Sequence, residues 1–233
     1  LNKMENFLSP TDFVGFTYFL TFMALAASSV FFIIERGDLK GKWRTSVTVA
    51  ALITGIAAVH YYYMRHFWLV TASSPTEYRY IDWLITVPLQ IVEFYLILAT
   101  AGKVRVSLFY KLLVASLVML VFGYFGETNI LGMGGLPGFL IGMGGWLYII
   151  YEIFVGEAAS LNNQSPSTSA HSAFNTLRLI VTIGWSIYPI GYFLGYLAGG
   201  VDENMLNIVY NLADFVNKIA FGLVIWAAAK NES

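Results

Sequence analysis

The segment MLNIVYNLADFVNKIAFGLVIWAAA occupies residues Met205–Ala229, and its only charged residues are Asp214 and Lys218. A helix that crosses the hydrocarbon core of a bilayer needs about 20 mostly apolar residues. The strands of a membrane β-barrel are about half as long and alternate between polar and apolar side chains. The length and the continuous apolar character of this segment therefore predict a membrane-spanning helix.

Six further apolar stretches precede this one. The seven predicted spans are about Val14–Ile34, Thr45–Tyr63, Tyr78–Ala99, Val106–Phe125, Leu136–Val155, Leu177–Leu197 and Met205–Ala229. The chain is 58% hydrophobic and 12% charged, whereas a soluble domain is about half apolar and about a quarter charged. Seven helices with short loops use roughly 200 residues. We therefore expect an all-α membrane protein, a seven-transmembrane-helix bundle that forms a single domain over residues 1–233.

The basic residues predict how the chain is oriented in the membrane. With seven spans, most of the lysines and arginines fall on one side: Arg36, Lys40, Lys42, Arg44, Lys103, Arg105, Lys111, Arg178 and Lys230. The other side has Lys3 and Arg65. Cytoplasmic loops carry an excess of Lys and Arg, so we expect the N-terminus outside and the C-terminus in the cytoplasm. An even number of spans would scramble this partition.

Composition excludes several classes of site. The chain has no cysteine, and so no disulfide framework, thiolate metal site or cysteine nucleophile. A net charge of -1 offers no basic face to nucleic acid. We expect no metal site, because His66 and His171 are predicted to lie in loops without a partner at metal-ligand spacing. The stretch Gly156–Ser172 is the most linker-like, and Leu1–Asp12 lacks the features of a signal peptide.

Ionisable residues within the apolar spans are the candidate functional groups. A charged side chain inside a span costs at least ~2.5–3.5 kcal/mol on insertion scales. The candidates are His60, Arg79, Asp82, Glu93, Asp214 and Lys218. Glu35 and Glu152 lie near span ends, where side chains can reach water, and we interpret both as interfacial.

Lys218 lies about 21 Å along the last span, near the middle of the bilayer or just past it. Asp214 comes four residues earlier and therefore shares its helix face. One interpretation is a structural ion pair that locks two helices. The other is a Schiff-base lysine with its carboxylate counterion, since buried lysines form imines with carbonyl compounds.

The third span places two carboxylates on one helix face. Arg79, Asp82 and Thr86 follow at intervals of three and four residues, and Glu93 comes almost three whole turns after Asp82. The rise between the two acids is ~16 Å. In the expected orientation Asp82 lies in the outer half and Glu93 toward the cytoplasm. The alternative is that each acid merely anchors a helix contact.

Three segments carry a resemblance to a known family. They are RYIDWLITVPLQ at Arg79–Gln90, WSIYP at Trp185–Pro189 and LADFVNK at Leu212–Lys218. These segments resemble the microbial rhodopsins, and most closely the proteorhodopsins of marine bacteria. The likeness covers essentially the whole chain, and the three segments agree with the family in content, order and topology.

The resemblance implies all-trans retinal bound to Lys218 as a protonated Schiff base. Asp82 would be the primary proton acceptor, Asp214 the second counterion and Glu93 the cytoplasmic proton donor. Three residues would act around the carboxylates: Arg79 beside the anionic groups, Thr86 as part of the proton-pump pattern, and His60 paired with Asp82. Tyr61 would lie near Asp214. The retinal pocket would be formed by Trp83, Trp185, Tyr188 and Pro189 along the polyene chain of retinal and by Trp146 near its ring.

Two positions refine what the resemblance implies. In the proteorhodopsins a glutamine at the place of Gln90 goes with blue absorption and a leucine with green, so we expect a blue-absorbing pigment. Phe19 stands where relatives often carry a tryptophan beside the histidine of a neighbouring subunit. The resemblance also implies a homo-oligomer, a pentamer or hexamer, embedded in lipid as a multi-pass protein of the bacterial inner membrane.

The expected function is light-driven outward proton transport, and the protein is not expected to be an enzyme. Glu93 is flanked by Ile91, Val92 and Phe94, an apolar setting that favours the protonated acid. An acceptor on the outer side and a donor on the inner side make transport outward. A slow-cycling light sensor with the same chromophore is the alternative. A third hypothesis is a transporter that does not respond to light, in which Lys218 is an ion-pair partner.

Overall fold

The computed structural model of the protein describes residues 7–232, so Lys3 lies outside the described part. Its long helices are α1 (Phe13–Glu35), α2 (Gly41–Thr71), α3 (Thr76–Ala101), α4 (Val106–Thr128), α5 (Gly135–Phe154) and α9 (Glu203–Glu232). Shorter elements are η1 (Arg36–Asp38), α6 (Glu157–Asn163), α7 (Thr168–Leu179), η2 (Ile180–Gly184), α8 (Ile187–Tyr192) and η3 (Phe193–Leu197). Within residues 7–232, seven helical stretches are long and apolar enough to cross a membrane, and this confirms the predicted number of spans.

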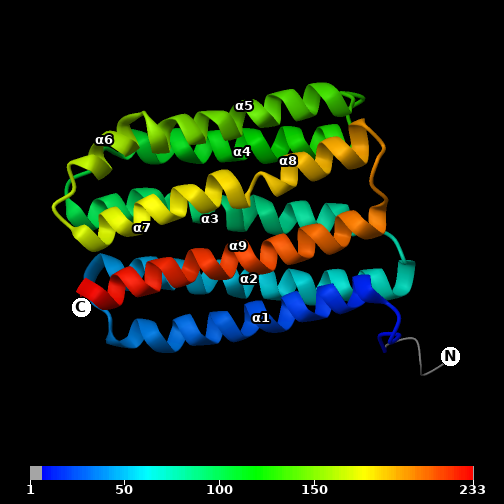
Figure 1. Cartoon of the computed structure of the whole chain (residues 1–233), viewed down its shortest axis with the longest axis horizontal. Helices are drawn as coiled ribbons and strands as arrows, with labels where there is room; N and C mark the ends of the chain where they lie inside the picture. Colours follow the sequence, from blue (N-terminus) through cyan, green and yellow to red (C-terminus); the bar gives the residue numbers. More distant parts are fainter. Residues whose placement is uncertain (1–6, 233) are drawn as a thin grey trace.

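The seven stretches lie lengthwise beside one another in a bundle (Figure 1). The sixth of them, Thr168–Leu197, is built from α7, η2, α8 and η3. The start of α1 and the end of α9 lie at opposite ends of the bundle (Figure 1). This arrangement is the one that an odd number of spans requires.

Polar side chains gather inside the bundle, chiefly on α3 and α9. The buried polar residues of these two helices are Arg79, Asp82, Thr86, Gln90, Glu93, Asn207, Asn211, Asp214, Asn217 and Lys218. Charged groups in a span face the bundle interior because contact with lipid is costly. Large apolar side chains such as Ile34, Val59 and Ile183 instead lie on the outer surface. The bundle is therefore apolar outside and partly polar within, as a protein surrounded by lipid must be.

The second span is longer than the sequence predicted. We expected it to end near Tyr63, but α2 continues to Thr71 and places His66 in a helix, not in a loop. The polar residues of this last part do not prevent a helix, because the backbone hydrogen bonds of a helix are internal. The helix ends where Ala72 adopts a left-handed conformation, with φ of 51°.

The linker-like interpretation of residues 156–172 is wrong for most of that stretch. Residues Glu157–Asn163 form α6, and α7 begins at Thr168, so that His171 is also helical. The Ser167 side chain accepts a hydrogen bond from the Ala170 amide at 2.9 Å and caps α7. The polar residues that suggested a linker are thus partly helix-capping residues.

Glu152 is buried, and not interfacial as we expected. One carboxylate oxygen accepts a hydrogen bond from the Tyr148 hydroxyl at 3.0 Å. The other accepts from the Glu157 amide at 3.0 Å, at the start of α6. Glu152 therefore caps the short helix that follows its own. Glu35, the other acid interpreted as interfacial, is partly exposed and pairs with Lys230 at 2.8 Å.

Candidate functional site

Lys218 lies between two aspartates in the middle of the bundle. Its Nζ is 2.9 Å from Asp214 Oδ2 and 3.2 Å from Asp82 Oδ2. The side chains are nearly inaccessible, with 3% of Lys218 and at most 1% of either aspartate exposed. A buried charge needs a partner, and here α3 and α9 each supply one carboxylate to the same amine.

Asp214 is held by hydrogen bonds on both of its oxygens. Tyr61 donates to Oδ2 at 2.7 Å, and Tyr188 donates to Oδ1 at 2.6 Å. The indole Nε1 of Trp83 also faces the carboxylate, at 3.2 Å from Oδ2. Because hydrogen bonds to a carboxylate stabilise its charged form, this environment keeps Asp214 as a fixed anion beside Lys218.

Asp82 has a different environment. Its Oδ2 is bonded to Lys218, but Oδ1 is buried without a hydrogen-bond partner among residues 7–232. The imidazole of His60 faces Oδ1, with its Nδ1 3.6 Å away. That ring nitrogen is also 2.9 Å from the Ile56 carbonyl of its own helix. Asp82 thus has a free oxygen on which a proton can be placed, and Asp214 does not.

Thr86 and Arg79 adjoin this centre, and neither side chain bonds directly to the carboxylate of Asp82 or Asp214. The Thr86 hydroxyl donates to the backbone carbonyl of Asp82 at 2.9 Å. Arg79 donates to the Tyr61 hydroxyl at 3.1 Å and so reaches Asp214 through that tyrosine. That bond comes from Nη1 of the guanidinium. The second terminal nitrogen, Nη2, lies within 3.0 Å of three further acceptors, on Tyr18, Asn207 and Asn211.

Tyr18, Asn207 and Asn211 were missed from the sequence. The signal that could have found the two asparagines is their spacing, since Asn207 and Asn211 lie four residues apart and Asn211 lies three residues before Asp214. All three side chains are buried. They bond the guanidinium of Arg79, whose hydrogen-bonded connection to Asp214 runs through the Tyr61 hydroxyl.

Glu93 lies about three helical turns along α3 from Asp82, and its polar neighbour is the buried hydroxyl of Ser46. Glu93 is buried completely, and neither carboxylate oxygen has a hydrogen-bond partner among the described residues. An unpaired buried carboxylate would be very costly in its charged form. This environment therefore suits a neutral acid that holds a proton.

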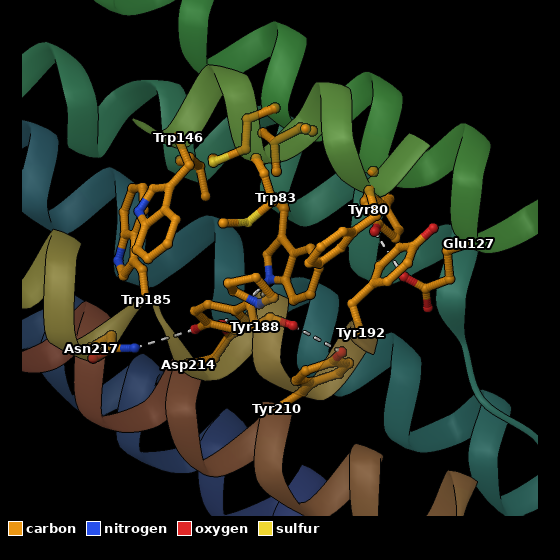
Figure 2. A pocket seen from close by; sticks show the side chains of 18 of the residues that line it. Tyr80, Trp83, Glu127, Trp146, Trp185, Tyr188, Tyr192, Tyr210, Asp214 and Asn217 are labelled. Atoms are coloured by element: carbon orange, nitrogen blue, oxygen red, sulfur yellow. Dashed lines mark hydrogen bonds between the residues drawn. The ribbon is translucent and has the colours of Figure 1, made fainter. Parts of the chain in front are cut away.

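A cavity begins at Lys218 and runs between α3, α4, α5 and the sixth span. The space between its lining atoms, including the part that opens outward, is about 830 Å³. Among the residues that line it are Trp83, Gln90, Trp146, Trp185, Tyr188, Pro189, Asp214, Asn217 and Lys218. Figure 2 shows the indole rings of Trp146, Trp185 and Trp83 and the phenol rings of Tyr188 and Tyr210 grouped around it.

Most of the residues expected in the pocket therefore lie together. Tyr61 is the exception, because it is not among the lining residues and its hydroxyl is engaged by Asp214. Gln90 is buried against the cavity, and its Nε2 has no hydrogen-bond partner in the described chain. A cavity of this size with apolar aromatic walls and few polar groups suits an elongated apolar ligand.

Comparisons with known proteins show the family to which the chain belongs. The family described as "Bacteriorhodopsin-like protein" matches residues 12–232. A green-light absorbing proteorhodopsin from Gamma-proteobacterium EBAC31A08 is 56% identical, covering 97% of this chain and 90% of the relative. The chain therefore belongs to the bacteriorhodopsin-like family.

Two solved structures are similar as well. The blue light-absorbing proteorhodopsin from Med12 is 52% identical with a TM-score of 0.82, covering 95% of this chain and 100% of that one. Xanthorhodopsin, described as a light-driven ion pump with dual chromophore, is 28% identical with a TM-score of 0.81, covering 97% and 96%. The microbial rhodopsin fold expected from the sequence is confirmed.

Proposed function

We propose that the protein is a light-driven proton pump that moves protons outward across the bacterial inner membrane, with all-trans retinal attached to Lys218 as a protonated Schiff base. One observation carries this proposal. Lys218 lies between a fully hydrogen-bonded aspartate, Asp214, and one with a free oxygen, Asp82, while a buried acid with no ion-pair partner among the described residues, Glu93, lies elsewhere in the bundle. Membership of the family and the likeness to a light-driven ion pump support it.

The residues present fit retinal. An amine at one end of an aromatic cavity suits an apolar aldehyde, and the walls that would hold it include Trp83, Trp185 and Tyr188. Bound retinal supplies the capture of light and a change of shape that alters the charge at Lys218 Nζ. The proton transfers that follow would be carried out by amino-acid side chains of the protein.

Asp82 would take the proton from Lys218 Nζ. Its Oδ2 is 3.2 Å from that nitrogen, and its unpartnered Oδ1 lies toward His60. Asp214 is the poorer acceptor because two hydroxyls and an indole already bond its oxygens. Glu93 would then return a proton to Lys218 Nζ, since a neutral buried acid is a proton store on the opposite side. Transport would be outward because the acceptor lies toward the outer side and the donor toward the cytoplasm.

The orientation follows from the basic residues. We propose that the N-terminus is outside, the C-terminus is cytoplasmic, and residues 1–233 form one seven-helix domain. Inverted membrane vesicles test the direction. Light should make the external medium more alkaline, because their cytoplasmic face points outward. Acidification of that medium by correctly inverted vesicles would refute outward transport.

A slow light sensor with the same chromophore is the alternative function. The isolated acid Glu93 favours the pump, because a sensor has no need of a rapid proton return. The non-photoactive transporter is tested separately by adding all-trans retinal to the purified protein. A visible absorption band would exclude the transporter, and its absence would exclude both light-driven functions.

The absorption band is expected to shift to longer wavelength on acidification. Protonation of Asp82 removes a negative charge beside Lys218 Nζ, and the positive ground-state charge there is then less stabilised. His60→Asn should move the midpoint of this spectroscopic titration, because His60 Nδ1 lies 3.6 Å from the Asp82 oxygen that has no hydrogen-bond partner among the described residues.

His66→Asn is the matched control, since His66 is exposed on the same helix. It should leave the midpoint where it is. An absorption maximum that stays constant through the acid and neutral range would count against Asp82 as counterion.

Gln90 is expected to make the pigment absorb blue light. A polar amide on the cavity wall stabilises the ground-state charge distribution more than the excited one. Gln90→Leu should therefore move the band to longer wavelength while retinal stays bound. Gln90→Met keeps nearly the length of the side chain without the amide, so it should shift the same way if polarity is the cause. A band that is unmoved, or blue-shifted, in both variants would contradict this assignment.

We further propose that the protein assembles in lipid as a ring of five or six copies. The Phe19 ring is exposed, and Arg65 lies over it at 5.4 Å from the ring centre. His60 is 20% exposed at the side chain and lies on the neighbouring helix. Spans associate through packing and polar contacts between helices. Mild native electrophoresis should show the ring, and a monomer in mild detergent would contradict it.

A further inference from the structure

The sixth span is not a continuous α-helix next to the pocket. In the π-helical segment η2 the Trp185 amide donates to the carbonyl of Ile180, five residues back, at 3.0 Å. Pro189 follows four residues after Trp185 and has no amide hydrogen to donate. The Tyr188 amide instead donates to the carbonyl of Trp185 at 3.1 Å. The carbonyls of Val181 and Gly184 are consequently among those that lose the donors an α-helix would give them.

Two side chains of the pocket bond these carbonyls. Trp146 Nε1 donates to the Val181 carbonyl at 3.0 Å, from α5. Asn217 Nδ2 donates to the Gly184 carbonyl at 3.0 Å, from α9. A buried carbonyl without a donor is costly, so both bonds stabilise the irregular segment. Asn217 directly precedes Lys218 and lines the same cavity.

The contact between Asn217 and Gly184 leaves no spare room. A Cβ atom added to Gly184 would lie 2.3 Å from Asn217 Oδ1. Asn217 Nδ2 is also 3.5 Å from the Tyr188 hydroxyl, as the dashed line from Asn217 in Figure 2 marks. The amide therefore lies between the lysine-bearing turn of α9 and the part of the sixth span that presents Trp185 and Tyr188.

We propose that Asn217 is a positioning residue that ties η2 to the turn of α9 that carries Lys218. The bond to Gly184 sets where Trp185 and Tyr188 stand in the pocket wall, and it transmits a displacement at Lys218 to the sixth span. Asn217 acts through these residues, and the inference rests on the proposed function. Nothing in the sequence pattern alone marks this residue, because its role depends on the interrupted backbone opposite it.

Two independent variants break the same bond. Asn217→Ala removes the amide. Gly184→Ala keeps the amide but pushes it aside, because the far end of a flexible side chain is what the new methyl group meets. After a light flash, each variant should return to the dark state at least about threefold more slowly, since the wall must regain its place without this bond. The double variant should be no slower than the slower single variant, because residues in contact are not additive.

Asn204→Ala, in the exposed first turn of α9, is the control and should recover at the native rate. Asn217→Leu keeps nearly the size of the side chain without an N–H donor or a charge, and it should behave as Asn217→Ala does. A native recovery rate in Asn217→Ala would overturn the proposal, as would single effects that multiply in the double variant.

The same variants also distinguish a failure to fold from the loss of this hydrogen bond. If Gly184→Ala forms no pigment, the double variant should regain it, since the clashing amide is gone. A double variant that remains colourless would count against the proposal. The unsubstituted protein tests the proposed function separately, because that function fails if the protein forms no pigment with retinal. If the protein is coloured but the substitutions at Gly184 and Asn217 slow recovery independently of each other, only the present inference is refuted.

Discussion

Lys218→Ala protein mixed with all-trans retinal is expected to show no red-shifted visible band. In the proposed function this amine is the attachment point, and Asp214 at 2.9 Å and Asp82 at 3.2 Å are the anions that stabilise its positive charge. Without it no covalent pigment can form, so the loss should be complete. Absorption spectroscopy of the purified protein gives the answer.

Lys230→Ala is the matched control, because Lys230 lies on the same helix and pairs with Glu35, far along α9 from the site. It should keep the band. Removing Lys218 leaves two buried carboxylates unpaired and can cost about 3–5 kcal/mol, so a second measurement guards against unfolding. Borohydride reduction of the unsubstituted pigment followed by peptide mass spectrometry should find the adduct on Lys218. An adduct on another lysine, or a normal band in Lys218→Ala, would contradict the assignment.

Glu93→Gln is expected to slow the return of the proton to Lys218 Nζ by at least about tenfold. The amide keeps the shape of the side chain but has no titratable proton. The first deprotonation should be nearly unchanged, since in the proposed function Asp82, and not Glu93, takes that proton. Flash photolysis separates the two steps.

Glu152→Gln provides a buried glutamate elsewhere in the bundle as the control. Its carboxylate is already hydrogen-bonded to Tyr148 and to the Glu157 amide. This variant should leave both steps of the light cycle near their native rates. An unaltered cycle in Glu93→Gln would refute the donor role.

The number of spans could be predicted because the bilayer imposes it. Seven apolar stretches and the distribution of lysine and arginine are properties of the chain itself, and the structure has seven such helices within residues 7–232. Helix ends could not be predicted as well. Arg65 and His66 interrupt the apolar run in the continuation of α2, and polar residues are frequent in residues 156–172, so hydropathy predicts loops where the structure has helices.

The candidate site was predictable where spacing decides proximity. Asp214 and Lys218 are one turn apart on one helix, so their contact follows from the sequence. Which aspartate is free depends on hydroxyls from other helices, those of Tyr61 and Tyr188, and no spacing within one helix reports them. The same reason explains why Asn217 was missed: its acceptor at Gly184 arises from a backbone interruption on another span.

Illumination of intact bacterial cells that contain the protein and retinal tests outward proton transport most directly. A pH electrode in a weakly buffered suspension should record acidification of the medium in the light and its reversal in the dark. A protonophore should abolish the signal, and Asp82→Asn cells should not produce it. Coloured cells whose medium stays unchanged or becomes alkaline in the light would contradict the account.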